Sequence, residues 1–312
     1  MDIPLNQPKT TALNRGYLIG VSGVFLWSWT GIFISYLLKN YPLAPMTLAF
    51  WRDVIVTGSL FIGFALFRRS ALRIAPHDRK FLLLYGLSLT FMNVTWTWSV
   101  ALNGAAVSTV LVYASPGITA LAARVFFKER LSPIRIAAFI SSLIGCVFVA
   151  RANDPAQWNL NAGGILIGVL SAFSFTGYSL MGKAVSHRQI NSWTATLGAF
   201  AVAAVALLPI ATLSLSGAEV GRTSLLSLGT HWGGWLILFV LAVIPTIGGF
   251  GLYTASLGYL AAGTANLIAT LEPVLTTIWA YILLHESLDP AQLLGGAFII
   301  ASVISLRLEE KT

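Results

Sequence analysis

The chain has 312 residues, of which 56% are hydrophobic and only 10% charged, and its formal net charge is +8. Soluble domains usually carry about 25% charged residues, so a water-soluble protein with a mean hydropathy of +0.80 could not cover its own apolar surface. The composition therefore excludes a soluble globular protein and predicts a membrane protein. The single cysteine, Cys146, lies in an apolar run. It excludes an internal disulfide and any cysteine-rich metal site, and we interpret it as a small buried apolar residue.

Ten apolar runs are long enough to cross a hydrocarbon layer of ~30 Å, which takes roughly 20 helical residues. The first run is too long for the apolar region of a signal peptide, so we expect a retained helix. The connections are short, the longest being 67–79 and 214–232, and they leave no room for a soluble domain. In chain order the predicted helices are 16–38, 46–66, 80–101, 104–126, 132–150, 161–181, 191–213, 233–257, 263–284 and 290–308.

The positive charges alternate between the two sides of these predicted spans. Fifteen of the 19 Lys and Arg residues fall on the side of the N-terminus, three fall on the other side, and Arg52 lies inside the second run. Such a bias predicts that both termini are cytoplasmic, and it explains the net charge without a nucleic-acid partner. The first group is Lys9, Arg15, Arg68, Arg69, Arg73, Arg79, Lys80, Arg124, Lys128, Arg130, Arg135, Lys183, Arg188, Arg307 and Lys311, and the second is Lys39, Arg151 and Arg222.

The two halves of the chain match each other at a constant spacing of 157 residues. Trp96-Thr97 matches Tyr253-Thr254 at this spacing. In addition, Ser28-Trp29-Thr30-Gly31 resembles Ser174-Phe175-Thr176-Gly177, and the two helices that carry these motifs open with Gly16/Gly20 and Gly164/Gly168. Three further pairs share the 157-residue spacing: Pro116 and Pro273, Glu129 and Glu286, and Pro133 and Pro290.

Five helices in each half is an odd number, so the second half must enter the membrane from the opposite side. The expected fold is an all-α integral membrane protein with ten transmembrane helices arranged as two inverted five-helix repeats. We divide the chain into a cytoplasmic tail (1–15), a first repeat (16–150) and a second repeat (161–308). Binding sites in such proteins lie near the midplane between the repeats.

The repeated Pro, Glu and Pro at the junction of the fourth and fifth helices of each half resemble the EamA domain pair of the drug/metabolite transporter superfamily. The position of Arg52, near the start of the second helix and after Pro45, also resembles the pattern of that family. The resemblance spans about residues 16–308 and implies a ten-helix exporter of the bacterial inner membrane with a central cavity. The tryptophan-rich first half resembles the aromatic amino acid exporters, which implies amino acid substrates with aromatic or apolar side chains.

Aromatic and polar residues at matching helical positions are the candidates for the cavity wall. Asn93, Trp96 and Thr97 share one helix face, and Trp98 points away from that face, so it is our second choice. Aromatic rings suit an apolar or aromatic substrate by stacking and a cationic head by cation–π attraction. Packing or interfacial anchoring is the alternative for each tryptophan. The predicted substrate-binding residues are Trp29, Asn93, Trp96, Trp98, Tyr113, Phe175, Tyr178, Tyr253 and Asn266.

Charged residues and prolines inside the spans are the second group of candidates. Glu272 could bind a proton or a substrate amine, or form a structural hydrogen bond. Arg52 is a possible polar anchor, and its neighbour Asp53 diverges from it on the helix, so no salt bridge between them is implied. Pro116 and Pro273 should bend their helices and free carbonyls that could bind an ammonium group, or serve as structural kinks alone.

Glu129 and Glu286 lie at helix ends, where we expect them to hold a turn by capping or pairing.

Other classes of function fit the sequence less well. Gly177 to Lys183 resembles a phosphate-binding loop, but Ala184 follows instead of Ser or Thr, and the segment ends a membrane helix, not a strand. With no nucleotide site, no metal site and no cofactor expected, transport must be secondary or facilitated. An intramembrane enzyme would need paired acids or buried histidines, whereas His77, His187, His231 and His285 lie in loops or at helix ends.

A broad-specificity drug or amine exporter and a channel stay open as alternatives. We expect the duplicated chain to function as a monomer, because it already encloses its own cavity.

Overall fold

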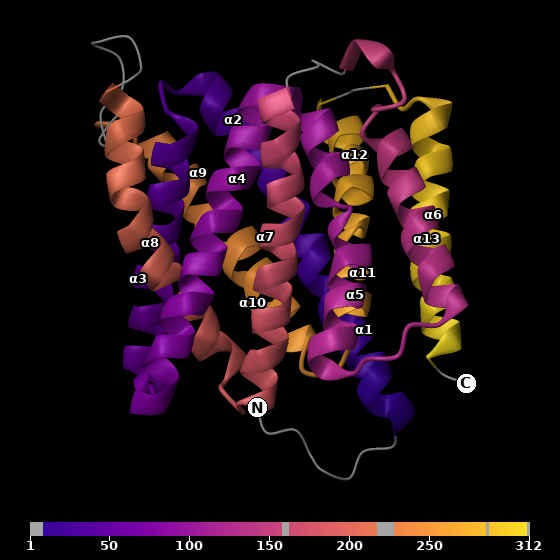
Figure 1. The fold of residues 1–312 in the computed structure, drawn as a ribbon. Helices are drawn as coiled ribbons and strands as arrows, with labels where there is room; N and C mark the ends of the chain where they lie inside the picture. The colour runs from indigo at the N-terminus through magenta and orange to yellow at the C-terminus, as the bar shows by residue number, and fades with distance from the viewer. Residues whose placement is uncertain (1–8, 158–161, 217–227, 285–286, 311–312) are drawn as a thin grey trace.

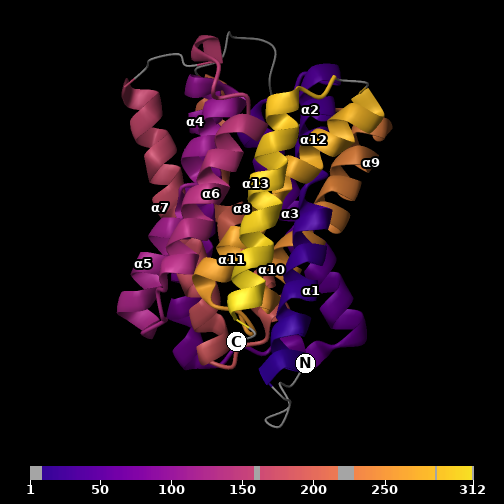
Figure 2. The same cartoon turned by 90° about the vertical axis from the view of Figure 1, so that its right-hand side faces the viewer.

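The computed structural model describes residues 9–157, 162–216, 228–284 and 287–310. Four residues used above, Arg222, His285, Glu286 and Lys311, lie outside these ranges. The described residues form helices joined by short turns, without a strand. The helices stand side by side in one bundle, and α1 begins at the same end of the bundle at which α13 finishes (Figures 1 and 2).

In the first half, the helices follow the predicted runs closely, with breaks inside two of them. Helix α4 contains a non-helical residue, Gly104, with φ of 78°, which marks the turn predicted between 101 and 104. Such a positive φ is accessible to glycine at little cost. The helices are α1 (Lys9–Trp27), α2 (Thr30–Asn40), α3 (Pro45–Phe67), α4 (Arg79–Val112), α5 (Ser115–Phe127) and α6 (Pro133–Val149).

Helix α1 starts seven residues earlier than predicted, because polar residues can continue a helix beyond the apolar region as long as its backbone hydrogen bonds are made. The loop before α4 holds two short 3-10 turns, η1 (Arg69–Leu72) and η2 (Pro76–Asp78), and a third, η3 (Pro155–Gln157), follows α6.

In the second half, the apolar run around Pro245 is interrupted by a π segment. The hydroxyl of Thr246 donates to the carbonyl of Leu241 at 2.8 Å, which satisfies an acceptor of the distorted turn. The elements are α7 (Ala162–His187), α8 (Ser192–Ser216), α9 (Trp232–Leu241), η4 (Ala242–Ile247), α10 (Gly248–Ser256), α11 (Ala262–Ala269), α12 (Leu271–Leu284) and α13 (Pro290–Glu309).

Seven segments of the described chain are long and apolar enough to cross a membrane: 10–40, 45–67, 162–187, 192–213, 232–256, 262–283 and 290–309. The segment 76–112 passes the same test together with α5, from which it is bent by 45°, and α6 is a shorter apolar helix. Phe67, Val125 and Val205 are among the many large apolar side chains that point outward. Several long apolar helices with apolar outer surfaces identify a multi-pass membrane protein.

Helices from one half of the chain pack mainly against helices from the other. Helix α4 lies along α7, α6 along α13, α3 along α8, α1 along α10, and α5 along α11. The pair α6 and α13 lie next to each other in both views (Figures 1 and 2). Their backbones approach closely where two glycines meet, since a Cβ placed on Gly145 would lie 2.6 Å from the carbonyl oxygen of Gly295. Small residues allow such close helix packing within a membrane.

Candidate functional site

A buried hydrogen-bond network around Asn266 joins three helices in the half of the bundle that contains the start of α1. The Asn266 amide donates to the hydroxyls of Thr119 at 2.9 Å and Ser179 at 3.0 Å. Its carbonyl oxygen accepts from Ser115 at 3.0 Å. All four side chains are fully buried. Because buried polar groups are costly unless paired, this network fixes α5, α7 and α11 against one another.

Three tyrosines extend this network into a closed layer. Tyr85 and Tyr178 stack with ring centroids 4.9 Å apart, and both hydroxyls meet the hydroxyl of Thr254, at 3.1 and 3.4 Å. The hydroxyl of Tyr253 lies 2.7 Å from that of Ser179. The three tyrosines are fully buried. We call Tyr85, Tyr178, Tyr253, Thr254, Ser179 and Asn266 the tyrosine layer.

Trp27, which the sequence reasoning missed, packs against the tyrosine layer. Its ring centroid lies 4.4 Å from that of Phe250, 5.7 Å from that of Tyr253 and 6.0 Å from that of Phe175. Trp29, the predicted residue, instead stacks on Trp279 at 4.5 Å. A spacing of 148 residues relates Gly16 to Gly164, Gly20 to Gly168 and also Trp27 to Phe175, so this signal was present in the sequence.

The breaks in the spans are supported by polar side chains. Between α1 and α2, the carbonyl of Ser28 accepts from the Thr276 hydroxyl at 2.9 Å, and the Ser28 hydroxyl accepts from the Trp279 indole at 2.9 Å. Tyr113 directly follows the last residue of α4, and Thr270 directly follows that of α11. These two residues are 157 apart, and the buried prolines Pro116 and Pro273 each follow three residues later.

Tyr113 and Glu272 meet between these two breaks, because the hydroxyl of Tyr113 donates to the carboxylate of Glu272. Tyr113 is buried and Glu272 is half-buried. The hydrogen bond thus links a predicted site residue of the first half, Tyr113, to one of the second half, Glu272. A carboxylate held there, next to the helix breaks, is suited to bind a cationic group or to exchange its proton.

A second buried charge cluster lies between α3 and α4. The guanidinium of Arg52 donates through Nε to the Asp53 carboxylate at 3.0 Å, and Nη2 lies 3.0 Å from the same oxygen. The Asn93 amide donates to the other carboxylate oxygen at 3.3 Å. Helix geometry alone did not imply this salt bridge. It forms because the long arginine side chain folds back to its buried neighbour.

The predicted tryptophans of α4 take different positions. Trp98 is 48% exposed and lies on the outer apolar stripe of the helix with Leu84 and Phe91. Trp96 lies on the opposite side, one turn after the buried Met92, yet its own side chain is 36% exposed. Trp98 thus points away from the buried face of α4, whereas Trp96 lies on that face and is nevertheless exposed.

Hydrogen bonds also close the end of the bundle at which α1 begins. The carboxylate of Glu310 accepts from Tyr17 at 2.9 Å, Thr264 at 2.6 Å and Arg135 at 2.8 Å. Glu129 accepts from the backbone N–H of Ala262 at 3.1 Å, which confirms the capping role expected for it. These contacts connect α1, α6, α11 and α13 at one end.

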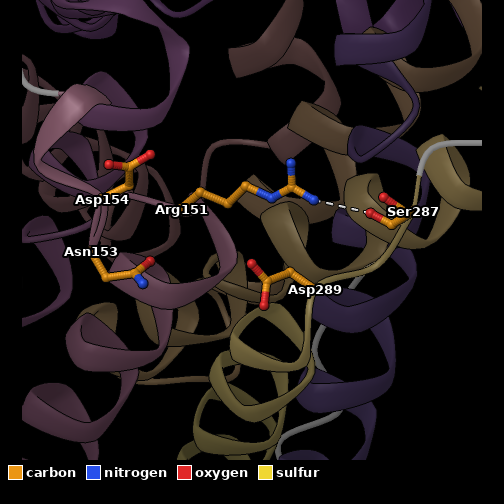
Figure 3. A pocket seen from close by; sticks show the side chains of 5 residues that line it. All are labelled: Arg151, Asn153, Asp154, Ser287 and Asp289. Atoms are coloured by element: carbon orange, nitrogen blue, oxygen red, sulfur yellow. Dashed lines mark hydrogen bonds between the residues drawn. The ribbon is translucent and has the colours of Figure 1, made fainter.

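At the opposite end, a hollow of about 440 Å³ is lined by Arg151, Asn153, Asp154, Ser287 and Asp289 (Figure 3). Arg151 crosses it and donates to the carbonyl of Ser287 at 3.0 Å and to Gln292 at 3.1 Å. No predicted substrate-binding residue lines this hollow.

Comparison with known proteins places these features in a family context. The model of the EamA-like transporter family matches residues 14–151 and 162–308. An "Uncharacterized inner membrane transporter YicL" of Salmonella typhimurium is 24% identical over 307 residues, covering 95% of this chain and 96% of the relative. The "Threonine/homoserine exporter RhtA" of Escherichia coli K12 is 26% identical over 252 residues, covering 79% of each. A solved crystal structure aligns with a TM-score of 0.74 and 18% identity, covering 95% of this chain and 99% of that one, which supports the fold.

Proposed function

The chain belongs to the EamA-like transporter family, and from this premise we propose that it exports small amphipathic metabolites as a secondary transporter. Amino acids with aromatic or apolar side chains are the proposed substrates, and a broad range of drugs or amines is the alternative. The similarity to a threonine/homoserine exporter supports the amino acid class. The buried aromatic rings of the tyrosine layer and of Trp27 support a side chain that can stack. We place the protein in a bacterial inner membrane, with both termini cytoplasmic and the monomer as the functional unit.

We propose ten spans in two inverted repeats. The turn at Gly104 divides α4 into two spans, of which the second continues into α5, and α6 forms another. Reciprocal packing supports the repeat, because a Cβ on Gly16 would meet Leu260 and a Cβ on Gly164 would meet Asn103. Asn103 and Leu260 are 157 residues apart. Likewise Ser141 donates to the carbonyl of Phe298, 157 residues away, as expected where a pseudo-two-fold axis passes.

The observation that carries the transport mechanism is the difference between two equivalent positions. Tyr253 is fully buried in the tyrosine layer, whereas Trp96, its counterpart at the 157-residue spacing, is 36% exposed. In an inverted repeat these residues lie on opposite sides of the midplane. We therefore assign the structure to a state in which the gate at the end where α1 begins is closed and the gate at the other end is more open. Alternating access follows when the two halves exchange these arrangements, so that the first gate opens and the second closes.

The substrate is proposed to bind between the two gates, beside the Tyr113–Glu272 pair. Its ammonium group would approach the Glu272 carboxylate, and its side chain would lie against the aromatic residues. Arg52 pairs with Asp53, and the other carboxylate oxygen of Asp53 accepts from Asn93. We propose that this chain of contacts holds α3 against α4.

Counterflow in proteoliposomes tests this function. Liposomes loaded with phenylalanine, tryptophan, leucine or threonine should accumulate the labelled amino acid in a saturable manner, and Glu272→Gln should not. Exchange of quaternary amines alone would favour the drug or amine exporter. Ion conductance in planar bilayers without saturable exchange would identify a channel and contradict the proposal.

A further inference from the structure

The connection between α5 and α6 lies at the end of the bundle at which α1 begins (Figure 1), and a second hollow lies at this connection. It is lined by Arg124, Lys128, Glu129, Arg130, Leu131 and Ser132. We propose that this hollow, with the outer face of α5 above it, binds the phosphate headgroup and acyl chains of an anionic phospholipid.

The residues that line the hollow include three cationic side chains and one acidic side chain. Arg124, Lys128 and Arg130 are exposed, and none of their side chains has an acidic partner among the described residues. The one acid of the hollow, Glu129, turns its carboxylate away to cap α11 at Ala262. Three cations therefore line one hollow, a composition that resembles the basic pockets between helices that bind acidic headgroups.

The face of α5 next to these cations is suited to an acyl chain. Leu121, Arg124 and Val125 follow the spacing i, i+3, i+4, which places them on one side of the helix, and Lys128 follows directly after its last residue. Leu121 is 58% exposed and Val125 is 75% exposed. One turn earlier, a Cβ added to Gly117 would find no atom within 4 Å, so this face of α5 is uncovered there as well. Apolar residues that continue into cations at a membrane surface match the two parts of a lipid.

The equivalent hollow at the opposite end supplies a contrast within the same molecule. Ser287 and Asp289 line it at positions 157 residues after Arg130 and Ser132. It contains two acids and a single cation, Arg151, whose guanidinium is held by the carbonyl of Ser287 and by Gln292 (Figure 3). The same backbone framework is thus cationic at one end only, as expected if that end meets acidic lipid.

The first test compares two triple variants by native mass spectrometry of the purified protein with phosphatidylglycerol and phosphatidylcholine of equal chain length. Arg124→Gln/Lys128→Gln/Arg130→Gln should weaken phosphatidylglycerol binding about tenfold or more, whereas the matched control Arg68→Gln/Arg69→Gln/Arg73→Gln should weaken it by about twofold at most. The control removes the same charge from loop 68–73. Equal losses in both variants would overturn the proposal. So would competition by inorganic phosphate as strong as that by phosphatidylglycerol, because the ligand would then be a free anion.

The second test uses the unmodified chain and does not depend on a variant that folds. A photoreactive phosphatidylglycerol should form adducts concentrated within 117–132. Adducts spread equally over 68–80 and 117–132 would contradict the proposed lipid site.

Discussion

Trp96 and Tyr253 occupy equivalent positions 157 residues apart. Trp96 lies eight residues before Gly104 and Tyr253 lies eight residues before Ala261, and each of these two residues directly precedes the next helical segment. Tyr253 is fully buried, and its hydroxyl meets that of Ser179, whereas Trp96 is 36% exposed. Two equivalent side chains therefore have different environments in one structure. Such an asymmetry is what a carrier with two related gates requires when one gate is closed.

Glu272→Gln should lower the rate of counterflow at least tenfold, because it removes the only charge in the Tyr113–Glu272 pair that can attract an amine. Tyr113→Phe should have a smaller effect, because the carboxylate of Glu272 that attracts the amine stays in place and only its hydrogen-bond donor is removed. Initial rates of labelled amino acid exchange measure both. Wild-type rates in Glu272→Gln, with normal monodispersity in detergent, would remove this residue from the transport site.

Trp96→Ala should reduce counterflow strongly, because Trp96 lies on the buried face of α4, toward the end of the bundle that we propose to be open. Trp98→Ala is the matched control, two positions along the same helix, and its outward ring should be dispensable. The ratio of the two initial rates is the measurement. If the two variants retain equal activity, Trp96 does not line the substrate pathway.

Asn266→Ala should destabilise the protein by about 2 kcal/mol, because it removes three interhelical hydrogen bonds that average about 0.6 kcal/mol each in a membrane protein. Asn40→Ala is the control, since the exposed Asn40 makes one bond to the carbonyl of Tyr36 within its own helix. Thermal unfolding in detergent compares them. A melting temperature unchanged by Asn266→Ala would mean that the network does not hold α5, α7 and α11 together.

Gly145→Ala and Gly295→Ala should each destabilise by about 1–3 kcal/mol, because the new methyl group overpacks the contact between α6 and α13. Gly58→Ala and Gly63→Ala in α3 are matched controls, since an added Cβ meets no atom within 4 Å at either position. These two changes should leave stability unchanged or raise it by about 0.4–1 kcal/mol. Unfolding by denaturant distinguishes the pairs, and similar stability for all four would show that the helices separate easily.

Much of the fold could be predicted from the sequence because membrane-spanning helices leave a strong apolar signal. The run at 132–150 corresponds to α6 within one residue, and the glycine at 104 marks a turn by its positive φ. Breaks inside spans were harder to predict. The one at Ser28 depends on Thr276 and Trp279, which are about 250 residues away and become neighbours only in the folded bundle.

In the candidate site, too, residues with a local sequence signal could be predicted, whereas those defined by distant contacts could not. Tyr113, Tyr178, Tyr253, Asn266 and Glu272 were found because aromatic and polar residues stand out in apolar helices, and the structure brings them into contact with other helices. The motif at Ser28 points to Trp29, whereas the 148-residue glycine spacing points to Trp27, the residue that contacts Phe175.

Tyr85 and Thr119 gave no signal in the sequence, since each gains its partner, Thr254 or Asn266, from the other half of the chain.

Paired thiol labelling tests the alternating-access account most directly. In a Cys146→Ser background, Thr97→Cys and Thr254→Cys place near-isosteric probes at equivalent positions, of which Thr97 is half-buried and Thr254 is buried. Without substrate, a membrane-impermeant maleimide should react with the cysteine at 97 and spare the one at 254. A saturating amino acid substrate should slow the first reaction and accelerate the second. Fixed reactivity at both positions during active counterflow would contradict the account.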